Sequence, residues 1–264
     1  MMDETSFGEL LRTWRDRRRL TQEELSHHAG VSTRHLSFLE TGRSNPSREM
    51  VLELAEHLEI PLRERNPLLT AAGFAPVYSR TPLEAPEMEA VRAAVNQVLA
   101  GHAPYPALAV DRYWNIVNMN AAAALFAQDV DPGLLPNVYR ISLHPDGLAP
   151  RVVNFPDLAH HLLHRLRHDV EVSADPVLAA LLEEVESYPD VRELARPALE
   201  HNAIVVPVRI RTPRGELSMF STITTFGTPV DVTVAELALE IFFPADAETA
   251  TRLNAMADAE EGVA

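Results

Sequence analysis

The sequence predicts two domains of different fold class. The first is an all-α domain of five helices, and the second is an α+β domain whose five-stranded antiparallel sheet is covered by helices. Helix caps and helical apolar spacing fill the first 73 residues, whereas the strand-like segments all lie beyond residue 105. Three prolines between Phe74 and Pro86 indicate a linker. The predicted domains are residues 1–75 and 87–264, joined by a linker over residues 76–86, and a chain of 264 residues is long enough for two cores.

The composition excludes several kinds of site and of protein. The chain has no cysteine, which rules out disulfides, thiolate zinc sites and cysteine nucleophiles. It has no apolar run of about 18 residues, and its N-terminus is acidic and polar, so we expect no signal peptide, no membrane span and a bacterial, cytoplasmic location. A Gly-rich phosphate loop and a serine nucleophile elbow are also lacking, so we do not expect an enzyme.

Residues 21–48 predict two short helices joined by a tight turn. A capping box starts one helix at Gln22, and Gly30 ends it. Ser32 caps the next helix, which ends near Thr41. This is the layout of a helix-turn-helix, whose second helix enters the DNA major groove. The other helices of the domain are predicted over residues 7–17, 46–58 and 61–73.

The same run resembles the Xre or phage-repressor type of helix-turn-helix, and the resemblance extends over roughly residues 6–73. The resemblance implies that Arg15 pairs with Glu40 and thereby braces the first helix against the recognition helix. It rests on residues that stand at the signature spacings: Gln22, Ala29, Gly30, Val31, Ser32, Leu36, Glu40, Gly42, Pro46 and Ser47.

The outward face of the recognition helix supplies the candidate DNA contacts. An arginine can form a bidentate contact with a guanine edge, and a phenylalanine can meet a thymine methyl group. We therefore predict base contacts from Thr33, Arg34, Ser37 and Phe38. Contacts to phosphates fix the register without reading sequence, and we predict them from Gln22, Arg43, Ser44 and Asn45.

The net charge of −15 does not exclude double-stranded DNA as a partner, because the acidic residues are unevenly distributed. Ten arginines stand against twelve acidic residues up to residue 73, whereas the rest of the chain has thirteen against twenty-six. A nearly neutral first domain with clustered arginines is compatible with DNA binding, although a single copy would bind modestly. We therefore expect a homodimer, which doubles the phosphate contacts, and an inverted-repeat operator.

The second domain is predicted to begin with a helix from Glu87, followed by a strand, a turn and a strand over residues 107–119. Asn120 can cap a short alanine-rich helix over residues 121–127. Later elements are helices over residues 157–170 and 176–188, strands over residues 204–211, 217–226 and 235–243, and a last helix capped by Asp246.

The strand, turn, strand and Asn-capped helix resemble the start of a PAS domain. Three further sequence segments occur in this order: Arg34-His-Leu-Ser-Phe-Leu-Glu40, Asn137-Val-Tyr-Arg-Ile-Ser-Leu-His-Pro-Asp146 and Phe242-Phe-Pro-Ala-Asp246. Together these features resemble the MmyB-like branch of Xre regulators, over nearly the whole chain. The resemblance implies a PAS-like ligand-binding domain, a small and largely apolar ligand such as a bound fatty acid, and no required cofactor.

A ligand cavity is expected where the sheet meets helices 121–127 and 157–170. Arg140 and His144 share strand-like parity, and we predict that they hold the ligand's carboxylate. Two alternatives remain open: a constitutive dimerisation or partner-binding module with an ordinary packed core, and a haem or flavin sensor. The apolar candidates for the cavity wall, each of which could also be a core residue, are Met119, Phe126, Leu143, Leu162, Val206, Val208 and Phe220.

Four histidines, His160, His161, His164 and His168, recur along the predicted helix 157–170. Their spacing places three imidazoles on one helical face, which could bind zinc. The apolar residues of the same helix lie roughly opposite, and no nearby acid completes a catalytic set. We therefore predict a solvated histidine face that points away from any core pocket, and no metal site.

Overall fold

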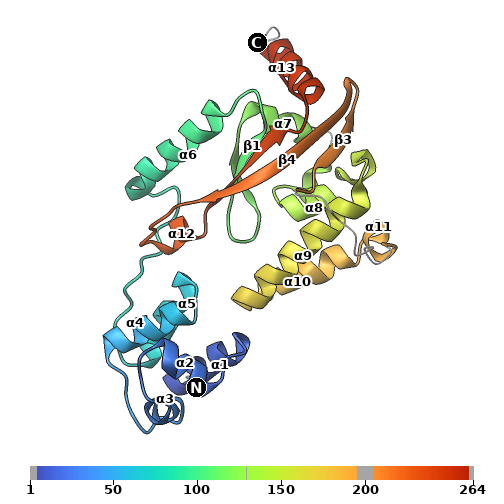
Figure 1. Cartoon of the computed structure of the whole chain (residues 1–264). Helices are drawn as coiled ribbons and strands as arrows, with labels where there is room; N and C mark the ends of the chain where they lie inside the picture. The colour runs from blue at the N-terminus through green and yellow to red at the C-terminus, as the bar shows by residue number, and fades with distance from the viewer. Residues whose placement is uncertain (1–4, 129, 195–204, 262–264) are drawn as a thin grey trace. The chain divides into compact units, whose positions relative to one another are not determined.

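The structure of the chain is a computed structural model, shown in Figure 1, that describes residues 5–128, 130–194 and 205–261. These residues form two compact units. The first unit contains a segment that lies, in sequence, between two strands of the second. The first unit consists of residues up to 81 together with residues 228–235, and the second consists of residues 82–227 and those from 236 onward.

Within the described residues up to 81, the first unit is helical, as predicted. Capping boxes start its first two helices, since the side chains of Ser6 and Thr21 accept from backbone N–H groups while Glu9 and Glu24 reach back to the caps. The helices are α1 (Phe7–Arg17), α2 (Gln22–His28), α3 (Thr33–Glu40), α4 (Arg48–His57) and α5 (Leu62–Ala71).

The core of the first unit holds α3 against α1. Leu36 and Leu39 of α3 are buried together with Leu11 and Trp14 of α1. Gly8 lies at the crossing, where a Cβ atom would approach the carbonyl oxygen of Glu40 to 2.5 Å. A residue without a Cβ is therefore required for this approach, and it fixes how α3 is presented.

The second unit contains the strands and the longer helices. Its elements begin with η1 (Pro86–Met88), α6 (Glu89–Gly101), β1 (Ala107–Val110), β2 (Ile116–Met119) and α7 (Ala121–Ala127). They continue with η2 (Pro132–Leu134), α8 (Val138–Leu143), η3 (Ala149–Arg151), α9 (Phe155–Ser173), α10 (Pro176–Glu186) and α11 (Pro189–Arg192). The last are β3 (Val208–Thr212), β4 (Gly215–Thr225), β5 (Ala238–Pro244) and α13 (Ala247–Glu261), while α12 (Val232–Ala235) belongs to the first unit.

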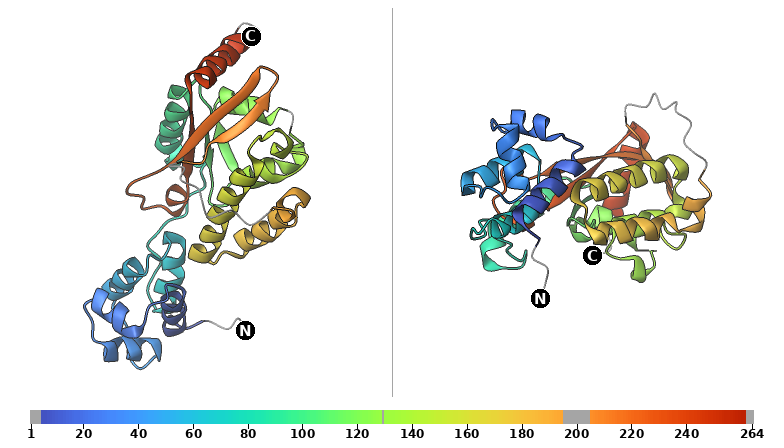
Figure 2. Two further views of the ribbon diagram at one scale, coloured as in Figure 1. Left: turned by 45° about the vertical axis from the view of Figure 1, so that its right-hand side comes forward. Right: turned by 90° about the horizontal axis from the view of Figure 1, so that it is seen from below.

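The described strands form one antiparallel sheet in the order β2-β1-β5-β4-β3, which confirms the predicted five-stranded sheet. Successive side chains of a strand point to opposite faces. Ala107 and Ala109 of β1 therefore pack with Leu99 of α6, whereas Leu108 and Val110 of β1 pack on the other side with residues of α8, α9 and α10. The sheet thus has helices over both faces (Figure 2).

Three local predictions differ from the structure. Residues 138–143 form helix α8 instead of the expected extended segment, because the side chain of Asn137 caps the N–H groups of Tyr139 and Arg140. Strand β5 begins at Ala238 and not at Ala235, since residues 232–235 are helical. Strand β3 begins at Val208, and Ile204, where a strand was predicted to start, lies outside the described residues.

Candidate functional site

The first candidate site is the outer surface of α3. Thr33 and Arg34 are exposed and Ser37 and Phe38 are half-buried, so the four predicted base-contacting residues lie on the side of α3 away from its core. The guanidinium of Arg34 lies 5.3 Å from the centre of the Phe38 ring, and that of Arg43 lies 6.0 Å from it. The Phe38 ring therefore lies close enough for a cation–π contact with two guanidinium groups, one from α3 and one from the loop that follows α3.

The loop after α3 supplies the predicted phosphate contacts. The backbone N–H groups of Arg43 and Ser44 both donate to the carbonyl oxygen of Phe38, at 2.8 and 3.2 Å. Gly42 adopts a φ of 70°, which allows this turn. The side chains of Arg43 and Asn45 are exposed, and that of Ser44 is half-buried. The loop is thus folded back against the end of α3, beside the predicted base-contacting face.

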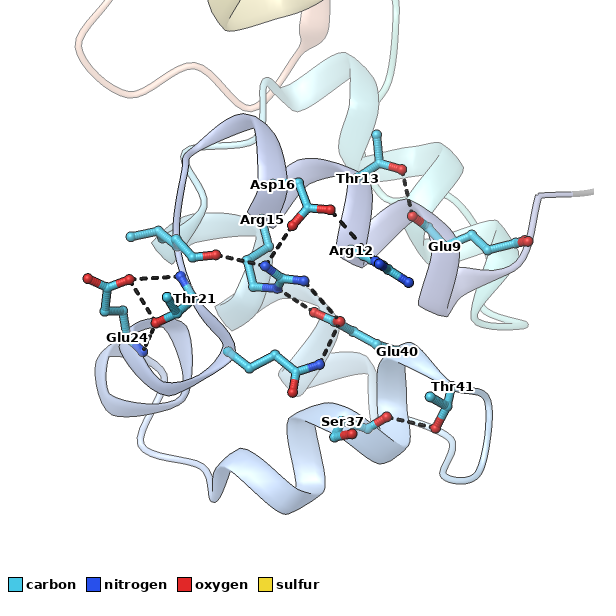
Figure 3. A network of polar contacts seen from close by, with 12 residues as sticks. Glu9, Arg12, Thr13, Arg15, Asp16, Thr21, Glu24, Ser37, Glu40 and Thr41 are labelled. Atoms are coloured by element: carbon cyan, nitrogen blue, oxygen red, sulfur yellow. Dashed lines mark hydrogen bonds and ion pairs between the residues drawn. The ribbon is translucent and has the colours of Figure 1, made fainter.

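Arg15 and Glu40 form the predicted brace between α1 and α3 (Figure 3). Their two contacts are 2.6 Å from Nε to Oε1 and 3.2 Å from Nη2 to Oε2, and the side chains are 10% and 3% exposed. The hydrogen bond with Glu40 raises the pKa of Arg15 above its ordinary value, although burial opposes this. Nε2 of Gln22 also donates to Oε2 of Glu40, at 2.9 Å. Gln22 therefore has a structural partner, and its contact with a phosphate stays a prediction.

The second candidate site is a cavity of about 430 Å³ within the second unit. It lies between the sheet and helices α7, α8 and α9, as expected, and its wall is mostly apolar. The sequence-predicted residues that line it are Met119, Phe126, Leu162, Val206, Val208 and Phe220.

The other three predicted residues, Leu143, Arg140 and His144, do not line this cavity. The reason is the helical conformation of residues 138–143, which places Ile141 and Ser142 on the cavity instead. Two guanidinium nitrogens of Arg140, Nε and Nη2, donate to the two carboxylate oxygens of Glu184 in α10, each at 2.7 Å. The ring of His144 packs edge-on against Tyr188, at 4.8 Å between centres.

Arg165 of α9 and Glu240 of β5 are the charged residues of the cavity wall. Nη1 of Arg165 lies 3.5 Å from Oε1 of Glu240, and their side chains are 15% and 7% exposed. Nε of Arg165 donates to the hydroxyl of Tyr139 at 3.2 Å. Ser221 of β4 donates to Oε1 of Glu240 at 2.8 Å. One point of a mostly apolar wall therefore has polar groups from four elements, α8, α9, β4 and β5.

The guanidinium of Arg165 is held firmly. It stacks over the indole of Trp114, with 3.9 Å from Cζ to the ring centre, and the indole Nε1 donates to Asp169 at 3.0 Å. Burial lowers the pKa of Arg165 more than any single neighbour raises it, but Glu240, Tyr139 and Asp169 together hold that pKa above its ordinary value. Nη2 of Arg165 is buried and has no hydrogen-bond partner among the described residues. A buried donor of this kind attracts an acceptor.

Arg165 and Glu240 were not predicted, although each carries a sequence signal. Arg165 follows Leu158 and Leu162 at helical spacing on the apolar face of α9, where an arginine is unexpected. Glu240 lies between Ala238 and Phe242 on one face of a strand. A charged residue on an apolar stripe is evidence for a buried polar site. This evidence is stronger when a second charged residue, on another element, faces the first.

The histidines of α9 lie differently from one another. His161 lines the cavity, which corrects the prediction that all four point away from a pocket. Burial and the charge of Arg165 lower the pKa of His161. A ring nitrogen of His160 lies 2.7 Å from the carbonyl oxygen of Pro156. Within residues 5–128, 130–194 and 205–261, no cluster of three or more histidine, aspartate or glutamate side chains is arranged to hold a metal ion.

Comparison with known proteins relates both sites to families. A model described as the MmyB-like transcription regulator ligand binding domain matches residues 91–256, and a helix-turn-helix domain model matches residues 6–68. The described part of the chain contains no helix of the length and apolarity that a membrane span requires.

Two individual proteins are similar to part of the chain. The HTH-type transcriptional repressor RghR of Bacillus subtilis (strain 168) is 44% identical over 57 residues, which are 21% of this chain and 42% of RghR. The chain therefore matches less than half the length of that relative. The crystal structure of the restriction-modification controller protein C.AhdI from Aeromonas hydrophila shares 34% sequence identity, over 25% of this chain and 98% of that one, with a TM-score of 0.23.

Proposed function

Since the chain belongs to the MmyB-like transcription regulators, whose ligand-binding domain matches more than half of it, we propose that it is a ligand-controlled DNA-binding protein. In this proposal the first domain reads an operator through α3. The second domain holds a small apolar molecule, a fatty acid or a related acyl compound. Binding of that molecule changes the affinity of the chain for its operator.

The surface of α3 supports operator binding. Arg34 and Arg43 flank Phe38, and the Arg15–Glu40 pair fixes α3 against α1. A recognition helix must be held rigidly, since bidentate contacts with base edges tolerate little misplacement. The charged brace lies on the buried side of α3, so the exposed arginines remain for DNA. This division of roles supports base contacts from Arg34 and phosphate contacts from Arg43.

The cavity is the observation that carries the ligand part of the proposal. Its volume of about 430 Å³ lies within the range of about 300–1,000 Å³ that is usual for small-molecule sites. Its wall is apolar except for a few polar side chains, which suits a molecule with a long apolar part and one polar end. An ordinary packed core, as the dimerisation alternative requires, would leave no such space.

Control by a ligand requires that the ligand prefers one state of the protein. A molecule that binds all arrangements equally shifts nothing, however tightly it binds. We propose that the chain acts as a homodimer on an inverted repeat, so that two copies of α3 enter major grooves about one or more helical turns apart. The ligand then selects the arrangement of the two reading helices that fits, or fails to fit, that spacing.

Native mass spectrometry of the purified chain, with analysis of its organic extract, tests the ligand part. We expect a co-purified acyl compound, or thermal stabilisation by one member of a fatty-acid panel. The Ala123→Leu variant fills the cavity wall at α7 and should lose this effect, whereas Ala94→Leu, at an exposed position of α6, should keep it. Neither co-purified lipid nor stabilisation would favour a plain dimerisation module, and the absorption spectrum of the same sample tests for haem or flavin.

Fluorescence anisotropy with labelled duplexes tests the DNA part. We expect tighter binding to the region upstream of the chain's own gene than to a random duplex, at physiological salt. The stabilising lipid should change the affinity for the upstream region more than the affinity for the random duplex. Equal affinity for both duplexes would remove the proposal that α3 reads sequence, because contacts with phosphates alone do not discriminate.

A further inference from the structure

The polar end of the cavity has no surplus of positive charge before any ligand enters. Arg165 supplies one positive charge, and Glu240 lies 3.5 Å from it with one negative charge. Asp169, one turn along α9, adds a second carboxylate beside Trp114 and acts on Arg165 electrostatically. The neighbourhood of the guanidinium thus already contains at least as much negative as positive charge.

The other titratable groups near Arg165 do not add positive charge. Burial, together with the charge of Arg165, lowers the pKa of His161, and the nearby His164 acts in the same direction. Burial raises the pKa of Tyr139, whose hydroxyl accepts from Nε of Arg165. Both groups are therefore neutral near pH 7, and Ser221, which donates to Glu240, is neutral at every pH considered.

One donor nevertheless remains without an acceptor. Nη2 of Arg165 has no hydrogen-bond partner among the described residues, while Nε and Nη1 face Tyr139 and Glu240. A ligand that brings an acceptor to Nη2 satisfies the last buried donor of this group. An uncharged acceptor does so without altering the charge balance.

A carboxylate at the same place is less favourable. It is attracted by Arg165 but repelled by Glu240, and it gives up its hydration on entering the cavity. Displacing Glu240 from the guanidinium does not solve this, because Glu240 would then be a buried charge without a partner. The ion pair that holds Arg165 in place therefore also discriminates against a second anion.

From this arrangement we infer that the cavity selects an amphiphile whose head is an uncharged hydrogen-bond acceptor, with Nη2 of Arg165 as its donor and Glu240 as the residue that excludes the carboxylate form. Suitable heads are a carboxamide, an ester, an alcohol or a protonated carboxylic acid. The inference rests on the proposed function, in that the second domain must bind an apolar small molecule. It adds that a fatty acid enters in its neutral form.

Isothermal titration of the full-length, delipidated chain with lauramide, methyl laurate and laurate tests this inference. At about pH 7.5 we expect lauramide to bind at least about tenfold more tightly than laurate. Lowering the pH should tighten laurate by about tenfold per pH unit, because the neutral fraction grows in that proportion. Lauramide does not titrate, so its affinity over the same range reports any effect of His161 itself.

A substitution separates Glu240 from other causes. Glu240→Gln keeps the shape and a hydrogen-bonding side chain but removes the negative charge, so laurate should become the tighter ligand at about pH 7.5. Glu248→Gln, at an exposed position of α13, is the matched control and should leave the preference for lauramide unchanged. Circular dichroism checks that both variants fold, and the pH dependence of the unsubstituted chain tests the inference without any variant.

The possible failures can be told apart. Tighter binding of laurate than of lauramide by the unsubstituted chain at neutral pH would overturn the inference but leave a ligand-binding second domain. A laurate affinity that is independent of pH would also overturn the inference alone. So would a Glu240→Gln variant that folds and still prefers lauramide. Failure of all three compounds to bind, with no lipid in the organic extract, would overturn the proposed function and the inference with it.

Discussion

The carboxylate of Asp231 accepts a hydrogen bond from the hydroxyl of Thr81, at 2.8 Å, although 150 positions separate them in sequence. The backbone N–H of Thr81 and the hydroxyl of Ser79 donate to the same oxygen, at 3.0 and 2.8 Å. The other oxygen accepts from the N–H of Thr233 at 2.8 Å. Asp231 therefore ties the segment between β4 and β5 to the chain that follows α5, within the first unit.

We expect Asp231→Ala to destabilise the first unit by about 1–3 kcal/mol, because it removes a buried carboxylate together with the four hydrogen bonds that it accepts. Urea denaturation followed by circular dichroism measures this change. Asp258→Ala, at an exposed position of α13, is the matched control and should change the free energy of unfolding by less than about 0.5 kcal/mol. Equal effects of the two substitutions would contradict the structural role of Asp231.

The contribution of Asp231 should also depend on pH. Burial opposes its charge, but the hydrogen bonds from Thr81 and Ser79 outweigh this and hold the pKa of Asp231 below its ordinary value. A lowered folded-state pKa gives a contribution that is fully present above the unfolded-state pKa of about 3.9 and is lost as the pH falls through the folded-state value. The stability difference between the unsubstituted chain and Asp231→Ala should be constant from about pH 7 to about pH 5 and shrink below about pH 4. A difference that grows on acidification would contradict this sign.

Arg15 and Glu40 should behave as a coupled pair. Arg15→Ala leaves the carboxylate of Glu40 buried without its main partner, and we expect a loss of about 3–5 kcal/mol in the free energy of unfolding of the first domain. The double variant Arg15→Ala/Glu40→Ala should cost clearly less than the sum of the single variants. Chemical denaturation of the four proteins of this cycle measures the coupling, and simple additivity would mean that the brace contributes little.

Arg34 and Arg43 should affect DNA binding in different ways. Arg34→Ala should lose about 1–3 kcal/mol of discrimination at one base position, since a bidentate contact to a base edge is removed. Arg43→Ala should weaken binding to all duplexes alike and reduce the salt dependence by about one phosphate contact. Anisotropy titrations against an operator and its single-base variants separate the two. A uniform loss for Arg34→Ala would make it a phosphate contact.

Arg165 and Arg140 should differ in their effect on ligand binding. Arg165→Lys keeps a positive charge opposite Glu240 but removes the free Nη2 donor, so we expect about 1.5–3 kcal/mol of lost affinity for the amide ligand. Arg140→Lys is the control, because Arg140 pairs with Glu184 outside the cavity. Calorimetric titration of both variants checks this. Equal losses would show that the variants act through stability and not through contact with the ligand.

Much of the fold could be predicted because its signals are local. Caps such as Thr21 and Asn120, and apolar spacing along α1 and α9, act within one or two turns and depend little on the rest of the chain. The same holds for six residues of the cavity wall, since an apolar residue on the inner face of a strand or helix faces the interior in most packings. The Arg15–Glu40 pair could be expected from family resemblance.

The charged end of the cavity could not be obtained in this way. Strand-like parity predicts Arg140 on the cavity, but a capping side chain, Asn137, starts a helix there and Arg140 pairs with Glu184. Arg165 and Glu240 come from a helix and a strand that are far apart in sequence, and their distance follows from how α9 packs on the sheet. The sequence by itself determined two domains, most of their helices and strands, and an apolar interior, because these follow from short-range periodicity and capping. The tertiary structure alone decided which charges meet inside that interior, because the energy of a buried charge depends on the partner that packing places beside it.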